Sequence, residues 1–189
     1  MTLVSIIQAT EDLHAGKVIA YPTEAVWGLG CDPFNESAFQ QLLALKKRPI
    51  EKGVILLASE IAQVEHLFKS LNSNIQQKII SSWYKQNPHA KATTWLLPSD
   101  STVPKWITGK HHSVAVRVTN HLLCQSLCES FGGFIVSTSA NPAGALPAKC
   151  LKSAKQYFND QITYLDGSLG LSPEPSRIID ASTGLIIRE

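Results

Sequence analysis

The chain carries little charge and lacks the marks of membrane and secreted proteins. Of its 189 residues, 17% are charged, and the formal net charge is +2. Because so small an excess gives no strongly basic surface, any anion site must come from local clustering of cations. No apolar run approaches the ~20 residues that cross a bilayer, and the first residues lack the basic and apolar regions of a signal peptide. We therefore expect a cytoplasmic protein that does not enter membranes.

The four cysteines lack the spacing of a disulfide framework or of a zinc site. Cys31, Cys124, Cys128 and Cys150 include no C-x-x-C pair, and no Cys/His set has the spacing of metal ligands. Cys124 and Cys128 lie on one face of an apolar helical pattern, which predicts small buried side chains. The sequence favours a reducing compartment and predicts no metal held by protein side chains.

Several nucleotide and hydrolase motifs are missing too. The chain has no G-x-x-x-x-G-K-[ST] loop, no G-x-S-x-G and no H-E-x-x-H. Gly28-Leu29-Gly30 lacks the third glycine of a dinucleotide-binding fingerprint. A nucleotide, if bound, would have to be held by side chains from several loops.

Strand and helix patterns alternate along most of the chain, which predicts an α/β protein. A closing hairpin favours a mixed sheet with flanking helices over a purely parallel sheet. We expect a single domain, residues 1–189. The predicted strands are 17–21, 54–58, 93–97, 114–118, 134–137, 162–165, 177–180 and 185–188. The predicted helices are 3–14, 36–47 with Asn35 as N-cap, 153–158, and three that begin at Ser59, at Asn72 or Ser73, and at Asn120. The segments 22–30 and 99–113 are predicted connections, and 86–92 is predicted to be irregular.

A basic cluster occupies Lys46–Gly53, between a predicted helix and a buried strand. Pro49 disfavours helical backbone at Arg48, so we expect the cluster on a loop rather than along a helix. Four cations so close together repel one another unless an anion binds. An exposed turn at the end of a helix explains the same residues, since cations suit a helix C-terminus. From this stretch alone both interpretations stay open.

Polar side chains lie at other predicted strands. Thr23, Ser137, Ser139 and Asn141 lie at or just beyond strand ends, and Arg117 lies inside a strand. Ligands of α/β proteins bind at such ends, so these residues predict an anion site. Serine and threonine after a strand more often make turns, so the hydroxyls do not decide the matter. Arg117 is the stronger signal, because a partly buried arginine needs an anion.

Four segments, in this order along the chain, resemble the YrdC family in its short bacterial form. The resemblance extends to the final Pro175–Asp180 and covers nearly the whole chain. The segments are Tyr21–Asp32 (YPTEAVWGLGCD), Leu45–Pro49 (LKKRP), Ser113–Val118 (SVAVRV) and Val136–Asn141 (VSTSAN).

The resemblance implies a fold and an activity. The fold is a twisted mixed sheet around a basic concave cavity. The activity is that of a nucleotidyltransferase, which forms L-threonylcarbamoyladenylate and pyrophosphate from L-threonine, bicarbonate or CO2, and ATP. The product serves the N6-threonylcarbamoyl modification of adenosine 37 in tRNAs that read ANN codons. The implied acceptor is the tRNA-modifying transferase complex, and weak binding of tRNA or RNA stays open.

The resemblance also implies site residues. We expect Mg2+ to be held through the ATP phosphates, and we assign no general acid or base. Positions that match ATP contacts are Lys46, Arg48, Lys52, Ser113, Ser139, Asn141 and, less securely aligned, Arg188. Positions that match threonine contacts are Thr23, Arg117, Ser137 and Ser176. Lys47, at the variable position of the basic motif, is expected to be replaceable.

The chain departs from the family pattern before its central strand. The family shows W-P-G-P-x-T there, and only Thr94 of the aligned stretch His89–Thr94 matches it. The change introduces Lys91, which we expect near the cavity. Two other functions remain open: an RNA-binding module that reads shape with the same basic cavity, and a family member that binds nucleotide without catalysis. The low net charge weighs against the first.

Overall fold

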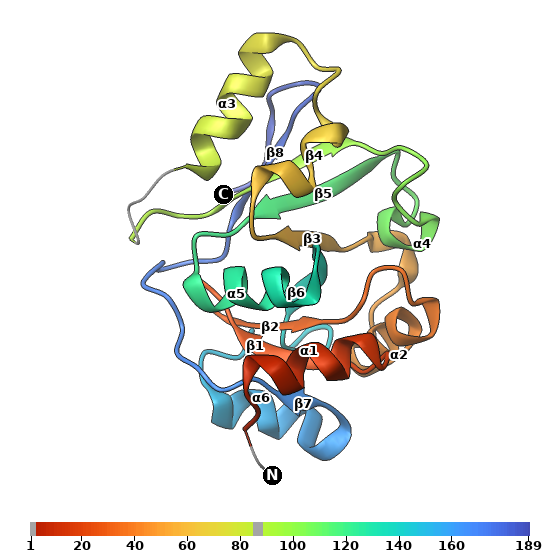
Figure 1. Cartoon of the computed structure of the whole chain (residues 1–189), viewed down its shortest axis with the longest axis vertical. Coiled ribbons are helices and arrows are strands. Elements are labelled where there is room, and N and C mark those ends of the chain that lie inside the picture. Colours follow the sequence, from red (N-terminus) through yellow and green to blue (C-terminus); the bar gives the residue numbers. More distant parts are fainter. Residues whose placement is uncertain (1–2, 85–88) are drawn as a thin grey trace.

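A computed structural model describes residues 3–84 and 89–189, and its centre is one mixed β-sheet (Figure 1). The sheet has nine strands in the order β7-β1-β2-β6-β3-β5-β4-β8-β9. The strands are β1 (Ile19–Pro22), β2 (Trp27–Gly30), β3 (Ile55–Ala58), β4 (Thr93–Pro98), β5 (Ser113–Val118), β6 (Ile135–Ser139), β7 (Thr163–Tyr164), β8 (Arg177–Asp180) and β9 (Ile186–Arg188).

The sheet contains both parallel and antiparallel pairs, so the predicted α/β class and mixed sheet are confirmed. The pairs β7–β1, β3–β5 and β4–β8 are parallel. The pairs β1–β2, β2–β6, β6–β3, β5–β4 and β8–β9 are antiparallel. The closing hairpin, β8 and β9, joins the sheet beside β4, although β4 lies far earlier in the chain.

Three of the described α-helices begin where a short polar side chain satisfies a free backbone amide. Ser5, Asn35 and Asn72 accept hydrogen bonds from the first turns of α1, α2 and α3. The α-helices are α1 (Ile6–His14), α2 (Glu36–Lys46), α3 (Ser73–Trp83), α4 (Lys105–Thr108), α5 (Leu122–Phe131) and α6 (Leu151–Phe158). Short 3-10 turns are η1 (Ile50–Lys52), η2 (Ile61–Gln63), η3 (Glu65–Leu67) and η4 (Asn159–Gln161).

The prediction of a loop throughout 22–30 was wrong, because β2 pairs with β1 in a hairpin. Gly28 and Gly30 hid the strand, since glycine weakens strand propensity. Their packing explains why glycine is needed. A Cβ on Gly28 would lie 3.2 Å from the Tyr21 ring, and one on Gly30 would lie 2.3 Å from the carbonyl oxygen of Val136.

Three further boundaries differ from the predictions. Ser59 caps no helix: its amide instead donates to Oε1 of Gln63, and only the 3-10 turns η2 and η3 follow. Asn120 is not the N-cap of α5, because the turn places His121 there, with its amide donating to Thr119 Oγ1. The 99–113 connection contains α4. The irregular segment predicted at 86–92 lies partly outside the described residues.

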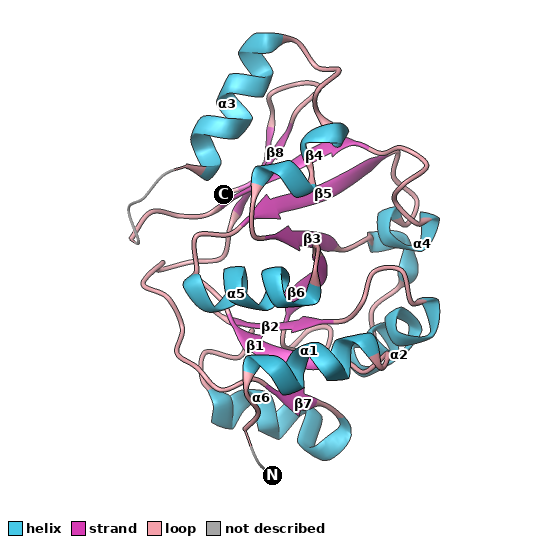
Figure 2. Ribbon diagram, in the orientation of Figure 1, coloured by secondary structure: helices cyan, strands magenta, loops and turns pink. Residues whose placement is uncertain are grey.

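Side chains from the two faces of the sheet form two cores. On β1, Ile19 and Tyr21 pack under α1 and α5, which face the viewer in Figure 2, whereas Ala20 faces the larger core on the other side. On β3, Leu57 likewise packs in the core under α1 and α5, and Leu56 packs in the larger core. This alternation follows from the period of two residues in a strand.

The predicted burial of Cys124 and Cys128 is confirmed. Cys31, Cys124 and Cys128 are buried, and Cys150 is exposed, each as a free thiol. Burial raises the pKa of Cys128 to about 12, so the thiol stays protonated at neutral pH. In the described residues, no helix is long and apolar enough to cross a membrane.

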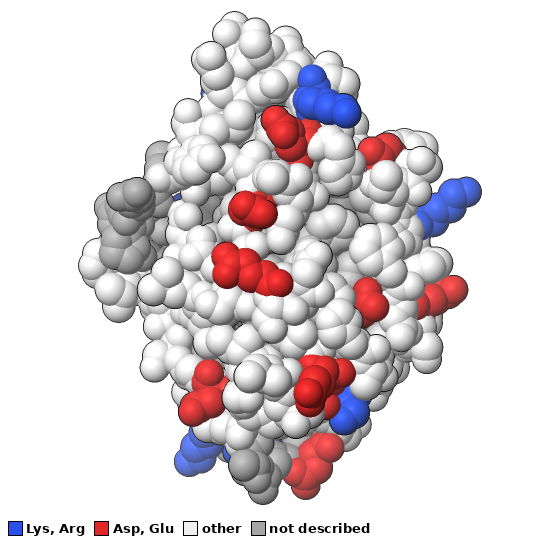
Figure 3. All heavy atoms as spheres, viewed as in Figure 1, with Lys and Arg blue, Asp and Glu red and all other residues white. Residues whose placement is uncertain are grey.

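Figure 3 shows the charges on the face that bears α1 and α5. Asp and Glu side chains are scattered over this face, and the visible Lys and Arg side chains lie mainly toward its margins. The basic residues of the chain are therefore not gathered on this face.

We predict that Gly30→Ala destabilises the protein by about 2 kcal/mol or more, because the new methyl group overlaps the Val136 carbonyl in a packed core. Gly133→Ala is the matched control: its Cβ would meet nothing within 4 Å, so the change should stay within about 0.5 kcal/mol. Urea unfolding of both variants checks this. Equal stability of the two variants would refute the tight contact at β2.

Candidate active site

A cavity of about 350 Å³ lies against β5, on the face of the sheet opposite Val114, Val116 and Val118. Its floor includes every second residue of β5, namely Ser113, Ala115 and Arg117, because Val114, Val116 and Val118 face the larger core. Ile55 of β3 and Ser137 of β6 extend the floor on the neighbouring strands. The cavity thus takes its shape from strand alternation.

The cavity brings together most of the residues singled out from the sequence. Lys46 and Asn141 are not among its lining residues. Those that line it are Thr23, Arg48, Lys52, Ser113, Arg117, Ser137, Ser139, Ser176 and Arg188. They come from distant parts of the chain, as binding by several loops requires.

Lys46 lies behind the cavity wall. Its side chain is only 4% exposed, and Nζ donates to the carbonyl oxygens of Ser139 and Asn141, the latter at 2.9 Å. Burial, together with the charge of Arg48, lowers the pKa of Lys46 to about 7. The ammonium therefore supports the loop after β6. Its predicted contact with ATP phosphate stays a prediction.

Asn141 belongs to the same supporting layer. Its Nδ2 donates to the carbonyl oxygens of Pro142, at 3.0 Å, and Ala145, at 2.8 Å. The amide group thus stabilises the turn that follows β6. In this structure Asn141 does not reach the cavity lining.

The basic turn closes on its own backbone. Arg48 Nε and Nη2 donate to the carbonyl oxygen of Gly53 at 3.1 and 2.7 Å, and Nη2 also contacts that of Lys52 at 3.3 Å. Burial lowers the pKa of Arg48. Lys47 takes left-handed backbone, with φ of 50°, and ends α2. The turn therefore presents Arg48 and Lys52 to the cavity and leaves Lys47 outside it.

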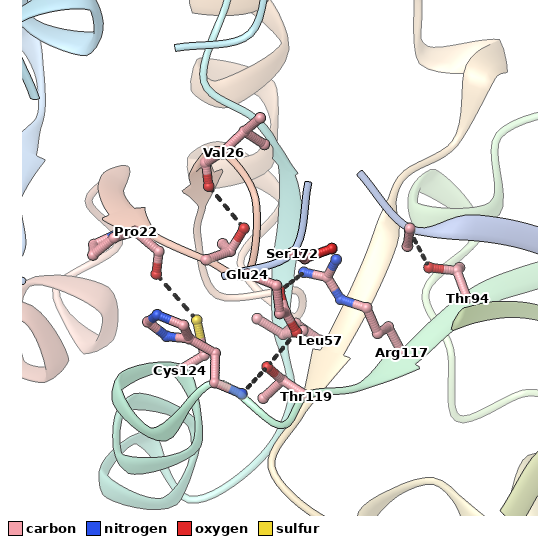
Figure 4. A network of polar contacts seen from close by, with 12 residues as sticks. Pro22, Glu24, Val26, Leu57, Thr94, Arg117, Thr119, Cys124 and Ser172 are labelled. Carbon is pink, nitrogen blue, oxygen red and sulfur yellow. Dashed lines mark hydrogen bonds and ion pairs between the residues drawn. The ribbon is translucent and has the colours of Figure 1, made fainter. Parts of the chain in front are cut away.

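Arg117 is paired with Glu24, a residue that the sequence reasoning missed (Figure 4). Arg117 Nη2 lies 3.3 Å from Glu24 Oε2, and both side chains are largely buried. Thr119 Oγ1 donates to Glu24 Oε1 at 2.7 Å. The signal was present, because a buried arginine needs an anion and Glu24 follows directly on the strand end at Pro22-Thr23.

The environment keeps Glu24 ionised. Burial by itself would raise the pKa of this carboxyl group, but the Arg117 charge and the Thr119 hydrogen bond outweigh it and hold the pKa below its ordinary value. Among the described residues, Glu24 Oε2 and Arg117 Nε are buried atoms without a hydrogen-bond partner. Both residues line the cavity, so a ligand bound there would meet two polar groups that lack a hydrogen-bond partner.

The C-terminal strands complete the wall. Arg188 Nε and Nη2 donate to the carbonyl oxygen of Ser176 at 3.1 and 2.5 Å. The Ser176 hydroxyl lies 2.8 Å from that of Thr94, the one residue retained from the altered family motif. Burial, and after it the charge of Arg117, lowers the pKa of Arg188.

The carboxylates of the cavity are not arranged around a metal. Glu24 is held by Arg117 and Thr119, and Glu174 pairs with Lys91 at 2.7 Å. Lys91 is therefore near the cavity rim, as expected, but its charge is met by an acid. In residues 3–84 and 89–189 no group of three or more His, Cys, Asp or Glu could hold a metal ion.

Comparison with known proteins agrees with this geometry. The family model described as telomere recombination, Sua5_yciO_yrdC, matches residues 11–189. The chain belongs to the Sua5/YciO/YrdC family. A family relative named threonylcarbamoyl-AMP synthase, from Acinetobacter baumannii (strain AYE), is 61% identical over 188 residues and covers 100% of both chains. A relative of the same name from Pseudomonas savastanoi pv. phaseolicola is 48% identical, over 96% of this chain and 95% of its own.

Solved structures of the Sua5/YciO/YrdC family share the fold. P. abyssi Sua5, solved in complex with L-threonine, superposes with a TM-score of 0.82 at 29% identity, over 93% of this chain and 50% of that one. E. coli YciO gives a TM-score of 0.79 at 23% identity, over 97% and 88% of the two chains. The resemblance noted in the sequence is thereby confirmed, and so is the expected fold.

We predict a pH dependence from Lys46. Because its pKa is lowered from 10.5 to about 7 in the folded protein, the unfolded chain binds more protons between these values. The wild type should therefore gain stability relative to Lys46→Met as the pH rises from 7 to 10, by up to about 1.4 kcal/mol per pH unit. Urea unfolding at pH 7, 8 and 9 measures the difference. Lys47→Met is the exposed control, and identical slopes for all three proteins would contradict the burial of the Lys46 charge.

Proposed function

We propose that this protein is a threonylcarbamoyl-AMP synthase. The observation that carries the proposal is the cavity itself, which joins a buried arginine and hydroxyl groups to a basic turn. Full-length relatives of that name support it. The substrates are L-threonine, ATP and bicarbonate or CO2, and the products are L-threonylcarbamoyladenylate and pyrophosphate.

The length of β5 suits two substrates that react end to end. Ser113 and Arg117 face the cavity from the same strand, and four residues span about 13 Å. Threonine binds at Arg117, whose guanidinium takes the carboxylate, with hydroxyls of Thr23, Ser137 and Ser176 nearby. ATP binds toward Ser113 and the basic turn. This arrangement holds the reacting groups between the two ends of the strand.

The chemistry needs positioning and charge neutralisation more than a protein nucleophile. The threonine amine, in its neutral form, adds to CO2 to give a carbamate and a proton. A carbamate oxygen then bonds to the α-phosphorus of ATP, and the bond to the departing pyrophosphate breaks. Arg48, Lys52 and Arg188 line the cavity and counter the charge that gathers on the phosphates. No general acid or base is assigned.

Magnesium fits this site as a companion of ATP. Glu24 and Glu174 are engaged with cations of the protein, so phosphate oxygens would supply the ligands, while serine hydroxyls of the cavity orient the nucleotide. Bound Mg2+ would neutralise phosphate charge during transfer. The proposed location is the cytoplasm, and the proposed acceptor of the product is the tRNA-modifying transferase complex. Weak tRNA binding stays a prediction.

One assay tests the proposed function. Pure protein is incubated with ATP, Mg2+, L-threonine and labelled bicarbonate. We expect threonine-dependent release of pyrophosphate and a labelled adenylate. No release above background, with ATP and threonine still bound, would instead indicate a nucleotide-binding protein without catalysis. tRNA binding without bound ATP or threonine would favour the RNA-binding alternative.

A lysine pair tests the position of ATP. Lys52→Gln should raise the KM for ATP about tenfold and leave the KM for threonine within about twofold, because it removes one charge-assisted contact with phosphate. Lys47→Gln removes the same charge from the same turn but outside the cavity. Its kinetics should match those of the wild type. Equal effects of the two variants would show that the turn acts only through its general charge.

A further inference from the structure

The Glu24–Arg117 pair presents opposite charges side by side in the cavity wall. Both residues line the cavity, and Glu24 Oε2 and Arg117 Nη2 are 3.3 Å apart. Both side chains are largely buried, with the Arg117 residue 7% exposed. In this low-dielectric setting a charge near the wall is felt more strongly than in water.

In the described residues, Glu24 Oε2 and Arg117 Nε have no hydrogen-bond partner, although Oε2 takes part in the ion pair with Arg117 Nη2. Thr119 holds Glu24 Oε1 at 2.7 Å and, through the same hydroxyl, accepts from the amide of His121 at 3.1 Å. The carboxylate is therefore fixed on one side. Figure 4 shows the two head groups directed toward each other from β5 and the loop after β1.

A ligand that satisfies both groups must carry an anion and a hydrogen-bond donor a few ångströms apart. An α-amino acid has this form: its carboxylate and its ammonium group are separated by one carbon. In the proposed orientation the amino acid lies antiparallel to the pair. Its carboxylate contacts the guanidinium of Arg117, and its ammonium group contacts the carboxylate of Glu24. A 2-hydroxy acid offers the same anion but no cation, so Glu24 would discriminate against it.

We propose that Glu24 is a specificity-determining residue that binds the amine of the threonine substrate through Oε2, while Arg117 binds the carboxylate. This inference rests on the proposed function and extends it to the amino group, for which sequence reasoning named no partner. It gives Glu24 two roles that a purely structural counter-ion lacks: it recognises the ammonium group of the ligand, and it fixes the position of the nitrogen, which releases a proton to solvent before it adds to CO2.

Calorimetric titration of the wild-type protein tests this without any mutation. L-threonine is compared with 2,3-dihydroxybutanoate, in which a hydroxyl replaces the amine. We expect threonine to bind about 10- to 100-fold more tightly, the range for one hydrogen bond to a charged group. Equal affinities would overturn the proposal and leave the proposed function intact. If threonine itself does not bind, the proposed function fails, and this inference with it.

The variant Glu24→Gln keeps the size of the side chain and removes its charge. It should lose about 10- to 100-fold in threonine affinity and less than about threefold in dihydroxybutanoate affinity, so the preference for the amine collapses. Glu174→Gln removes a cavity-rim charge that faces Lys91 instead, and should retain the wild-type preference. If Glu24→Gln instead lost affinity for threonine and for dihydroxybutanoate by the same factor, Glu24 would act only by positioning Arg117, and the proposal would be overturned. If that variant does not fold, the wild-type comparison still decides.

Discussion

The arginine in the middle of the sheet is the constraint on which the site depends. Arg117 lies inside β5 with apolar neighbours on the opposite face, and its side chain is largely buried. Glu24 supplies the counter-charge, and Thr119 holds Glu24 in place. Removal of either charged partner would leave the other buried and uncompensated, which is strongly destabilising. The fold and the proposed substrate site are therefore stabilised by the same contact.

The basic turn illustrates a different use of charge. Three of its cations were expected to face phosphate, but only Arg48 and Lys52 line the cavity, and Arg48 is itself bonded to the carbonyl of Gly53. Lys46 is turned inward onto the loop after β6. Lys46 thus stabilises a loop through hydrogen bonds to its carbonyl groups, whereas Arg48 and Lys52 line the cavity and are available to a ligand. A motif of three cations need not supply three ligands.

Local chemistry made much of the molecule predictable. Asn35 and Asn72 begin helices because their side chains accept from free amides, and the apolar run of β3 marks a buried strand. Arg117 could be singled out because buried arginine is costly. The predictions that failed depended on contacts between residues that are not neighbours in the sequence. The glycines of β2 are explained by packing against the Tyr21 ring across the hairpin. The direction of the Lys46 side chain depends on an acceptor 93 residues away in the sequence. Glu24 was overlooked because the anion for Arg117 was sought only in a ligand.

The closing hairpin makes the cavity depend on residues far apart in the sequence. Ser176 and Arg188 lie near the end of the chain, yet they complete a cavity whose floor is β5. β8 pairs with β4, so this edge of the sheet stays open until the final residues are available. Without β9 the cavity would lose Ile187 and Arg188 from its wall, whereas the buried residues of the two cores all lie earlier in the chain.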